Sequence, residues 1–350
     1  MKKILYPGLV ALSALILTQC KTEKKETSNE EQEKPYMSRI FEEGEIEAYE
    51  ESLWSIVPQE SKIQVIAEGH DWTEGPLWLP DQEMLLYTDI PRNAIYSWKK
   101  GEEAKLYLKP SGFTGDNFEG AEPGANGLLL NKKGNLVLCQ HGDRQIAEMQ
   151  SSVSQPTANY KTLTKAYKGK RFNSPNDGVY SSNGDLYFTD PPYGLPQRMD
   201  DPEKELSHQG VYRLSEDGEL TLLTTEFTRP NGITFSPDEK KLYVANSDPE
   251  FAVWKVFDVL EDGSITNGKI FYDATELVPS EKGLPDGLKV DKEGNLFATG
   301  PGGVFIFSAD GKLLGKIKTG QATSNCAFNK DKSILYITAD SYILRLNLRS

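Results

Sequence analysis

Six oxygen-bearing side chains recur along the chain, each at the start of the same kind of segment. Each of these openers precedes a short run of alternating apolar residues, a turn, and a second run rich in Leu, Tyr and β-branched residues. Carboxylate and amide oxygens are hard donors, so a group of them suits a hard divalent cation. The openers are Glu74, Asn126, Asn176, Asn231, Asp286 and Asn325.

The donor types narrow the choice of metal. None of the openers is His or Cys, the residues that zinc sites normally recruit. We therefore expect one divalent cation, Ca²⁺ first, with Mg²⁺, Mn²⁺ or Zn²⁺ as alternatives. A structural alternative is that Asn and Asp only satisfy backbone groups where strands begin. The recurrence of the pattern at six equivalent positions favours a shared site.

The openers need elements that bring them together. Successive openers lie 39 to 55 residues apart, and turns such as Asn183-Gly184-Asp185 carry the Gly and Asn residues that hairpins require. Further short apolar runs follow each hairpin, as at residues 210–214 and 303–307. Four strands in a unit of this length are typical of a propeller blade. We predict an all-β fold, a six-bladed β-propeller whose first strands line a central channel, with the openers at one mouth.

The last copy is short because the chain ends at Ser350, whereas residues 62–66 precede the first opener without a partner in their own blade. We predict that residues 62–66 complete the last blade and close the ring.

Five short motifs occur in order at this spacing. They are Glu74-Gly75-Pro76-Leu77-Trp78, Ser174-Pro175-Asn176-Asp177-Gly178, Thr189-Asp190-Pro191-Pro192-Tyr193-Gly194, Arg229-Pro230-Asn231-Gly232 and Leu284-Pro285-Asp286-Gly287. Together they make the chain resemble the SMP-30/gluconolactonase/luciferin-regenerating enzyme-like family over roughly residues 60–345. The resemblance implies a six-bladed propeller, one catalytic divalent metal and hydrolysis of sugar or related lactones.

The resemblance also implies roles for single residues. Glu74, Asn176, Asn231 and Asp286 would be the metal ligands, and Asp286 would also act as general base or orient the attacking water. Asn126 and Asp177 would contact the substrate or lie behind the ligands. Gly178 stands where near relatives often have a β-branched residue, a difference that concerns packing more than chemistry.

Other residues near the motifs are candidates on their own chemistry. His141 follows the second hairpin. Either it shuttles a proton or donates a hydrogen bond to the substrate, or it is a loop histidine held by hydrogen bonds. Arg144 and Arg229 are candidates for binding substrate oxygens, although Arg229 suits a pairing between blades equally well. Trp72 and Tyr193 lie in loops beside the motifs, unlike most aromatic residues here, which occupy strand positions.

The remaining chemistry agrees with a metal-assisted hydrolase. A cation polarises a lactone carbonyl, and a neighbouring carboxylate activates water. The chain has three histidines and no Gly-x-Ser-x-Gly sequence, so a serine-hydrolase elbow is not indicated.

The first residues have the pattern of a targeting segment. Lys2 and Lys3 precede an apolar run that ends Leu17-Thr18-Gln19-Cys20, which resembles a lipobox except for Gln19. We predict a lipoprotein signal peptide over 1–19, lipidation of Cys20, a solvated tether over 20–35 and the propeller over 36–350. Residues 38–54 carry apolar residues at helical spacing and predict one short helix.

Composition bounds partners and location. A net charge of −13 disfavours nucleic acid and anionic membranes. We expect a monomeric, exported cell-envelope lipoprotein that faces the periplasm or the cell surface and touches the membrane only through its lipid. Cys139 and Cys326 lie in apolar runs and are expected to be buried free thiols, with a disulfide as the alternative.

Three functions fit these observations. The first is a metal-dependent lactonase that acts on a small-molecule lactone. The second is a propeller that hydrolyses organophosphates or other phosphotriesters. The third is an envelope ligand-binding propeller with a purely structural cation, against which the complete set of four carried-over ligands argues.

Overall fold

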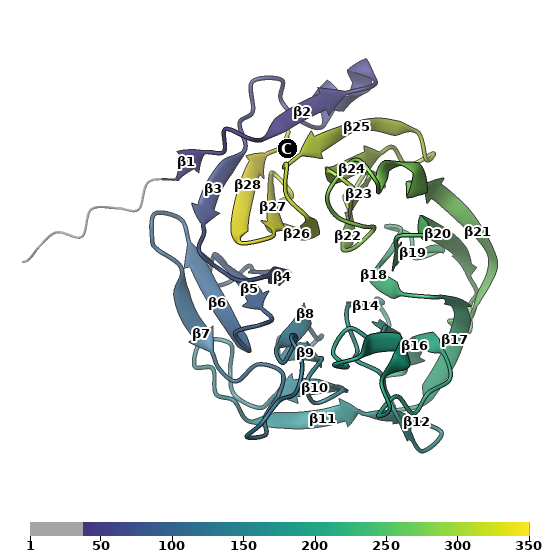
Figure 1. Ribbon diagram of the computed structural model, residues 1–350. Helices are drawn as coiled ribbons and strands as arrows, with labels where there is room; N and C mark the ends of the chain where they lie inside the picture. Colours follow the sequence, from purple (N-terminus) through teal and green to yellow (C-terminus); the bar gives the residue numbers. More distant parts are fainter. Residues whose placement is uncertain (1–37, 350) are drawn as a thin grey trace, which may run out of the picture. The chain divides into compact units, whose positions relative to one another are not determined.

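The computed structural model describes residues 38–349. These residues form six antiparallel sheets arranged around a central channel, as the sequence predicts (Figure 1). The predicted signal peptide, Cys20 and the tether lie outside the described residues. Among the described residues, no helix is both long and apolar enough to cross a membrane.

Each blade has four strands that follow one another from the channel outward. Blade 1 holds β4 (Thr73–Leu79), β5 (Met84–Asp89), β6 (Ala94–Lys99) and β7 (Lys105–Leu108). Blade 2 holds β8 (Ala125–Leu130), β9 (Leu136–Gln140), β10 (Gln145–Met149) and β11 (Tyr160–Thr164). Blade 3 holds β14 (Gly178–Tyr180), β15 (Leu186–Asp190), β16 (Gln209–Leu214) and β17 (Leu220–Phe227).

The second half of the ring repeats this order. Blade 4 holds β18 (Pro230–Phe235), β19 (Lys241–Asp248), β20 (Phe251–Val259) and β21 (Ile265–Asp273). Blade 5 holds β22 (Leu288–Val290), β23 (Leu296–Gly300), β24 (Gly303–Phe307) and β25 (Leu313–Lys318). Blade 6 holds β26 (Thr323–Phe328), β27 (Ile334–Ala339), β28 (Tyr342–Asn347) and β3 (Gln64–Ala67).

The ring closes as predicted, because an N-terminal strand completes the last blade. Strand β3 pairs antiparallel with β28, placing Val65 opposite Leu344 and Ala67 opposite Ile343. The two ends of the propeller are therefore held in one sheet.

The short helix predicted within residues 38–54 is present only as a 3₁₀ helix at the end of this stretch, and the residues before it form strands. The segment forms β1 (Arg39–Ile40), β2 (Glu45–Ala48) and the short 3₁₀ turn η1 (Glu51–Ser55). Strand β1 adds to β3, and β2 adds to the outer edge of β25 (Figure 1). Unpaired backbone groups on those two sheet edges take up the hydrogen bonds that a helix would have made internally.

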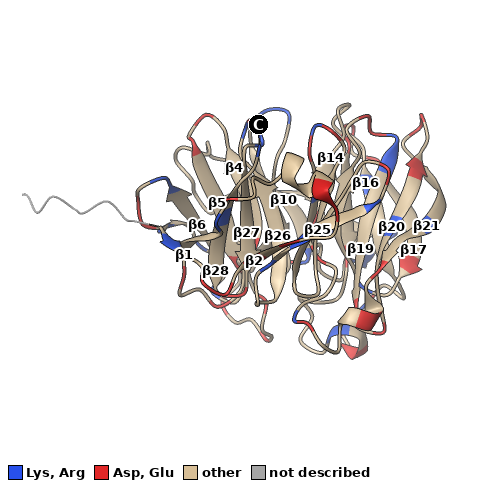
Figure 2. Cartoon of the chain, turned by 90° about the horizontal axis from the view of Figure 1, so that it is seen from above, with Lys and Arg blue, Asp and Glu red and all other residues tan. Residues whose placement is uncertain are grey.

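The loops carry the remaining short elements. A two-stranded ribbon joins β12 (Ala166–Tyr167) to β13 (Lys170–Arg171), and two further 3₁₀ turns are η2 (Arg198–Asp200) and η3 (Thr275–Leu277). Charged residues lie in the loops of both faces and on outer strands such as β17 and β21 (Figure 2).

The core is divided among the seams between blades. Six clusters of buried apolar side chains each draw on two neighbouring blades. Ile66 of β3, for example, packs with Leu85 and Tyr87 of blade 1 and with Tyr336 and Ile343 of blade 6. Cys139 and Cys326 are buried in different clusters and are free, so the expectation of two unpaired thiols is confirmed.

We expect Ile66→Ala to destabilise the closing seam. Ile66 is fully buried, so truncation removes apolar contacts and leaves a cavity costing about 2–5 kcal/mol in the free energy of unfolding. The matched change Ile270→Ala, on a side chain 48% exposed in β21, should stay within about 0.5 kcal/mol of wild type. Denaturant unfolding followed by circular dichroism measures both, and equal losses would contradict the importance of this seam.

Candidate functional site

One mouth of the channel opens into a cavity of about 430 Å³ that contains five of the six openers. We call it the opener cavity. The starts of the inner strands and the residues just before them bring these side chains from five different blades to one place. The five are Glu74, Asn126, Asn176, Asn231 and Asp286. The sixth opener, Asn325, is buried to a similar degree but lines a different cavity.

Four of the five openers present an oxygen that has no hydrogen-bond donor. These oxygens are enclosed, although buried polar atoms are almost always paired. Their convergence on one cavity favours a positively charged occupant with several oxygen ligands. The atoms are the Oδ1 oxygens of Asn126, Asn176, Asn231 and Asp286.

The carboxylates of this region repel one another. Burial, then the charge of Asp177, raises the pKa of Glu74 to about 7, although the Gly75 amide and Asn325 donate hydrogen bonds to its carboxylate. Burial, followed by the charges of Glu74 and Asp177, raises the pKa of Asp286 well above its ordinary value. A bound dication would offset both penalties, so these residues fit the cation that the sequence implies.

The donor set also bears on the kind of metal. Across residues 38–349 no group of three or more His, Cys, Asp or Glu side chains is placed to hold a metal ion. Any cation in the opener cavity therefore depends on amide oxygens in addition to Glu74 and Asp286. Oxygen donors of this kind suit a hard cation better than they suit zinc.

Asp177 lies outside the opener cavity, so of its two expected places, at the substrate or behind the ligands, the structure fits the second. Its side chain lines the cavity on the other side of the channel, where Oδ1 accepts from the Gly178 amide at 2.8 Å. Its Oδ2 lies 3.4 Å from Asn325 Nδ2 and 3.9 Å from Lys289 Nζ. Successive residues of an extended chain point to opposite sides, so Asn176 and Asp177 cannot both face one cavity.

Arg144 also lies outside the opener cavity, and its predicted contact with substrate has no structural support. Its Nε donates to the carbonyl of Phe172 at 2.7 Å and its NH1 to that of Glu203 at 3.0 Å. The guanidinium thus ties together the loops beside blade 3 and does not reach the channel.

His141 reaches the opener cavity only through another residue. The imidazole is fully buried, with Nδ1 3.2 Å from Oε2 of Glu122, and Glu122 lines the cavity. This approach is not a hydrogen bond, because neither ring nitrogen of His141 has a hydrogen-bond partner, and an ion pair with Glu122 requires a protonated imidazole. Sequence reasoning missed Glu122, because it lies in the long connection between β7 and β8, where no strand pattern places it.

The rim of the opener cavity is built by loops. Trp72, Tyr193 and Arg229 line it, as their positions beside the motifs suggested. The Tyr193 hydroxyl donates to the Ser247 carbonyl at 3.0 Å, and the Arg198 guanidinium lies 5.8 Å from the Tyr193 ring centroid. Arg198 and Glu281 also line the cavity and were missed, because neither stands in a repeated motif.

Comparison with known proteins adds to this geometry. The profile of the SMP-30/Gluconolactonase/LRE-like region matches residues 72–341, which is most of the chain. The chain belongs to this family.

Relatives within the SMP-30/gluconolactonase/LRE-like family span nearly the same length. The chain is 38% identical to a gluconolactonase from Zymomonas mobilis, over 88% of this chain and 87% of the relative. It is 25% identical to a pentonolactonase from Haloferax volcanii, over 76% and 80% of the two chains. A solved gluconolactonase from Xanthomonas campestris superposes with a TM-score of 0.77 at 28% identity, covering 90% and 98% of the two chains.

The raised pKa of Glu74 predicts how the cation and pH affect stability. Without a cation, Glu74 has a pKa of about 7 in the folded protein and an ordinary pKa of 4.5 in the unfolded chain. The folded protein therefore binds the proton more tightly, which stabilises the fold fully below pH 4.5. This stabilisation is lost as the pH rises to about 7. We expect the Tm of chelated wild type to fall more steeply over this range than that of Glu74→Gln. Added Ca²⁺ should raise the wild-type Tm above pH 7 and have little effect on the variant.

Scanning calorimetry across this pH range measures the effect. Glu216→Gln makes the same chemical change on an exposed turn and should behave as wild type. Parallel pH profiles for wild type and Glu74→Gln would contradict the electrostatic account of this cavity.

Proposed function

We propose that this protein is a lactonase that opens a sugar-type lactone in the opener cavity with the help of one divalent cation. The observation that carries the proposal is the set of four donorless oxygens in a cavity of a chain 38% identical to a gluconolactonase. The donorless oxygens would also suit the cation of a phosphotriesterase or a structural cation, so the identity to a gluconolactonase is what favours the lactonase over both alternatives.

The residues that would hold the cation are Glu74, Asn176, Asn231 and Asp286. Two carboxylates and two amide oxygens supply hard donors, and we propose Ca²⁺ on that chemistry. When bound, the cation would polarise the lactone carbonyl and stabilise the negative charge that develops on its oxygen.

Asp286 is the group best suited to activate water. Its carboxylate has two oxygens, so the donorless Oδ1 can bind the cation while the other oxygen accepts a proton from water. As water adds to the carbonyl carbon, its proton passes to Asp286. The same proton returns to the ring oxygen when the ester C–O bond breaks, which yields the open hydroxy acid.

The rest of the cavity suits a polyhydroxylated substrate. The Oδ1 of Asn126 can accept a hydrogen bond from a substrate hydroxyl. Arg198, Arg229 and Glu122 add charged donors and acceptors around the rim. Trp72 and Tyr193 offer flat faces against which a sugar ring can pack. A mixed lining of this kind favours a sugar lactone over an apolar phosphotriester.

We expect Asp286→Asn to lower kcat for gluconolactone by about 10²–10⁴-fold, because the amide cannot take the proton from water. The amide oxygen still offers a cation ligand, so calorimetry should detect residual Ca²⁺ binding. Asp217→Asn, the same change in the β16–β17 turn, should leave kcat unaltered. An unchanged rate for Asp286→Asn, or faster turnover of a phosphotriester than of any aldonolactone, would contradict the proposal.

Glu122 and His141 are expected to act as one unit. Because His141 reaches the cavity only through Glu122, Glu122→Gln and His141→Gln should each reduce kcat/KM by about tenfold. The double variant should be no worse than either single variant. His208→Gln, a matched change at a histidine that bonds Tyr212 outside the cavity, serves as the control. Additive losses in this cycle would show that the two residues act separately.

A further inference from the structure

The opposite mouth of the channel holds a second cavity, of about 530 Å³, that the proposed lactonase chemistry does not use. We call it the far cavity. Its lining shares no residue with that of the opener cavity. All six inner strands contribute to it, from Pro76 of β4 round to Phe328 of β26.

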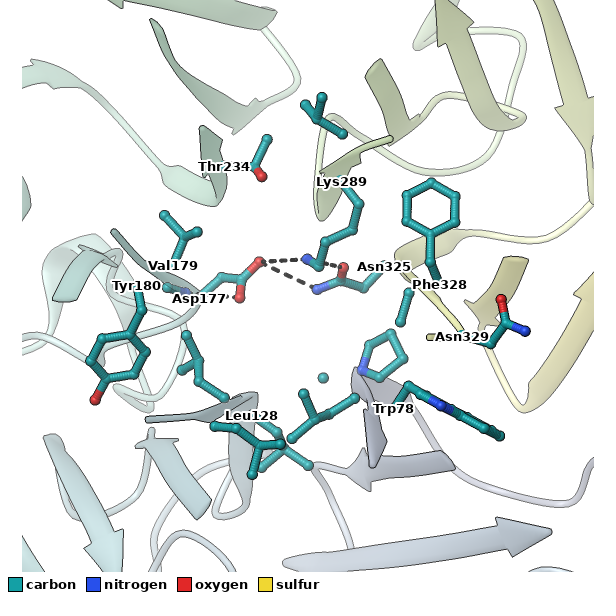
Figure 3. A pocket seen from close by; sticks show the side chains of 18 of the residues that line it. Trp78, Leu128, Asp177, Val179, Tyr180, Thr234, Lys289, Asn325, Phe328 and Asn329 are labelled. Carbon is teal, nitrogen blue, oxygen red and sulfur yellow. Dashed lines mark hydrogen bonds and ion pairs between the residues drawn. The ribbon is translucent and has the colours of Figure 1, made fainter. Parts of the chain in front are cut away.

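The two cavities are separated by a polar floor across the channel. Asn325 donates from Nδ2 to Glu74 at 3.1 Å and approaches Asp177 at 3.4 Å, and its Oδ1 accepts from Lys289 Nζ at 3.4 Å. Figure 3 shows Asp177, Lys289 and Asn325 meeting at the centre of the far cavity. A ligand in the far cavity would therefore rest on this floor and not enter the opener cavity.

The walls of the far cavity are mainly apolar and partly exposed. Large side chains from several blades surround the space, and the ring of Trp78 is directed away from its centre (Figure 3). The apolar lining residues include Trp78, Leu130, Val179, Val290 and Phe328, none of which is fully buried. Apolar surface gathered in a concave site, with a few polar groups at its base, is the usual composition of a small-molecule pocket.

The charge of the far cavity is opposite to that of the protein as a whole. Its charged lining residues are Lys289, Lys330, Lys332 and one acid, Asp177, in a chain of net charge −13. The opener cavity has the reverse bias, with Glu74, Glu122, Glu281 and Asp286 against two arginines. The two mouths therefore select ligands of opposite sign.

Lys289 is the group best placed to meet an anion. Its Nζ donates to the Leu288 carbonyl at 3.1 Å, and the side chain is 30% exposed at the base of the cavity. Its pairing with Asp177 is long, at 3.9 Å, which is outside direct hydrogen-bond distance. A carboxylate from the cavity side would supply the close charged acceptor that Asp177 does not.

We infer that the far cavity binds an aliphatic carboxylate, with its head group on Lys289 and its chain along the apolar wall. This inference does not depend on the lactonase proposal, because no residue of the opener cavity takes part. A polar hydroxy acid such as gluconate lacks the apolar surface that these walls would cover.

Calorimetric titration of the purified protein with decanoate tests the inference. We expect decanoate to bind saturably and with higher affinity than decanol or decylamine, because neither of those two carries a negative charge. Lys289→Gln should weaken decanoate binding by about tenfold or more, the value of one charge-assisted hydrogen bond. Val179→Asp should weaken it as well, by placing an acid in the wall. Lys269→Gln removes the same charge from an exposed position in β21 and should bind as wild type.

Fluorescence locates the ligand independently. A decanoate brominated on its chain should quench Trp78, and the quenching should be lost in Trp78→Phe and retained in Trp72→Phe, because Trp72 lines the opener cavity. Folding of each variant is checked by its Tm. No binding at millimolar decanoate, equal binding by decanol or by Lys289→Gln, or displacement by gluconolactone would each overturn the inference.

Discussion

The site depends on how closely the inner strands approach one another around the channel. Glycine follows several openers, and backbone or side-chain atoms of the neighbouring blade occupy the space that a side chain would need. A Cβ on Gly75, whose φ is +51°, would lie 2.1 Å from the Asn126 carbonyl oxygen, and one on Gly287 would lie 2.0 Å from Cγ of Asn325. Because no side chain intervenes, openers from separate blades reach one small cavity.

Hydrogen bonds between blades fix this approach. The Gly127 amide donates to the Asn176 carbonyl and the Gly287 amide to that of Ser324, both at 2.7 Å. Threonines at the ends of the second strands add side-chain bonds, as from Thr189 to the Asn231 carbonyl at 2.7 Å. The opener backbones are thus held from neighbouring blades, so their side-chain oxygens are oriented before any ligand binds.

The same convergence brings buried carboxylates close together, which is electrostatically unfavourable unless positive charge lies nearby. Glu74, Asp177 and Asp286 are brought together, and their mutual repulsion and burial raise the pKa values of Glu74 and Asp286. On the far side, Lys289 supplies an internal positive charge that opposes the rise at Glu74. On the opener side the positive side chains, Arg198 and Arg229, belong to the rim of the cavity. The proposed divalent cation is the counterpart of Lys289, supplied from solution rather than by the sequence.

The strand repeats allowed the propeller fold to be predicted from the sequence. The directions of side chains and the positions of loop residues could not be predicted in this way. The openers recur at a spacing typical of propeller blades, and residues 62–66 supply the strand that the short last blade lacks. The sequence did not show that Asp177 and Arg144 lie outside the opener cavity, because adjacency in sequence does not say to which side of a strand or turn a side chain points. Most of the segment at residues 38–54 forms strands because unpaired sheet edges were available to it. This is a tertiary effect that the local spacing of apolar residues does not predict.

The residues proposed to bind the cation and those proposed to contact a substrate come from different parts of the propeller. The oxygens proposed to bind the cation come from inner-strand starts, where a change in one backbone would clash with its neighbour. The groups proposed to face a substrate, Glu122, Tyr193, Arg198 and Glu281, come from the connections between strands and blades, which can vary without disturbing the sheets. If the proposed mechanism holds, changes in the loops can alter the choice of lactone while the residues proposed to bind the cation stay the same.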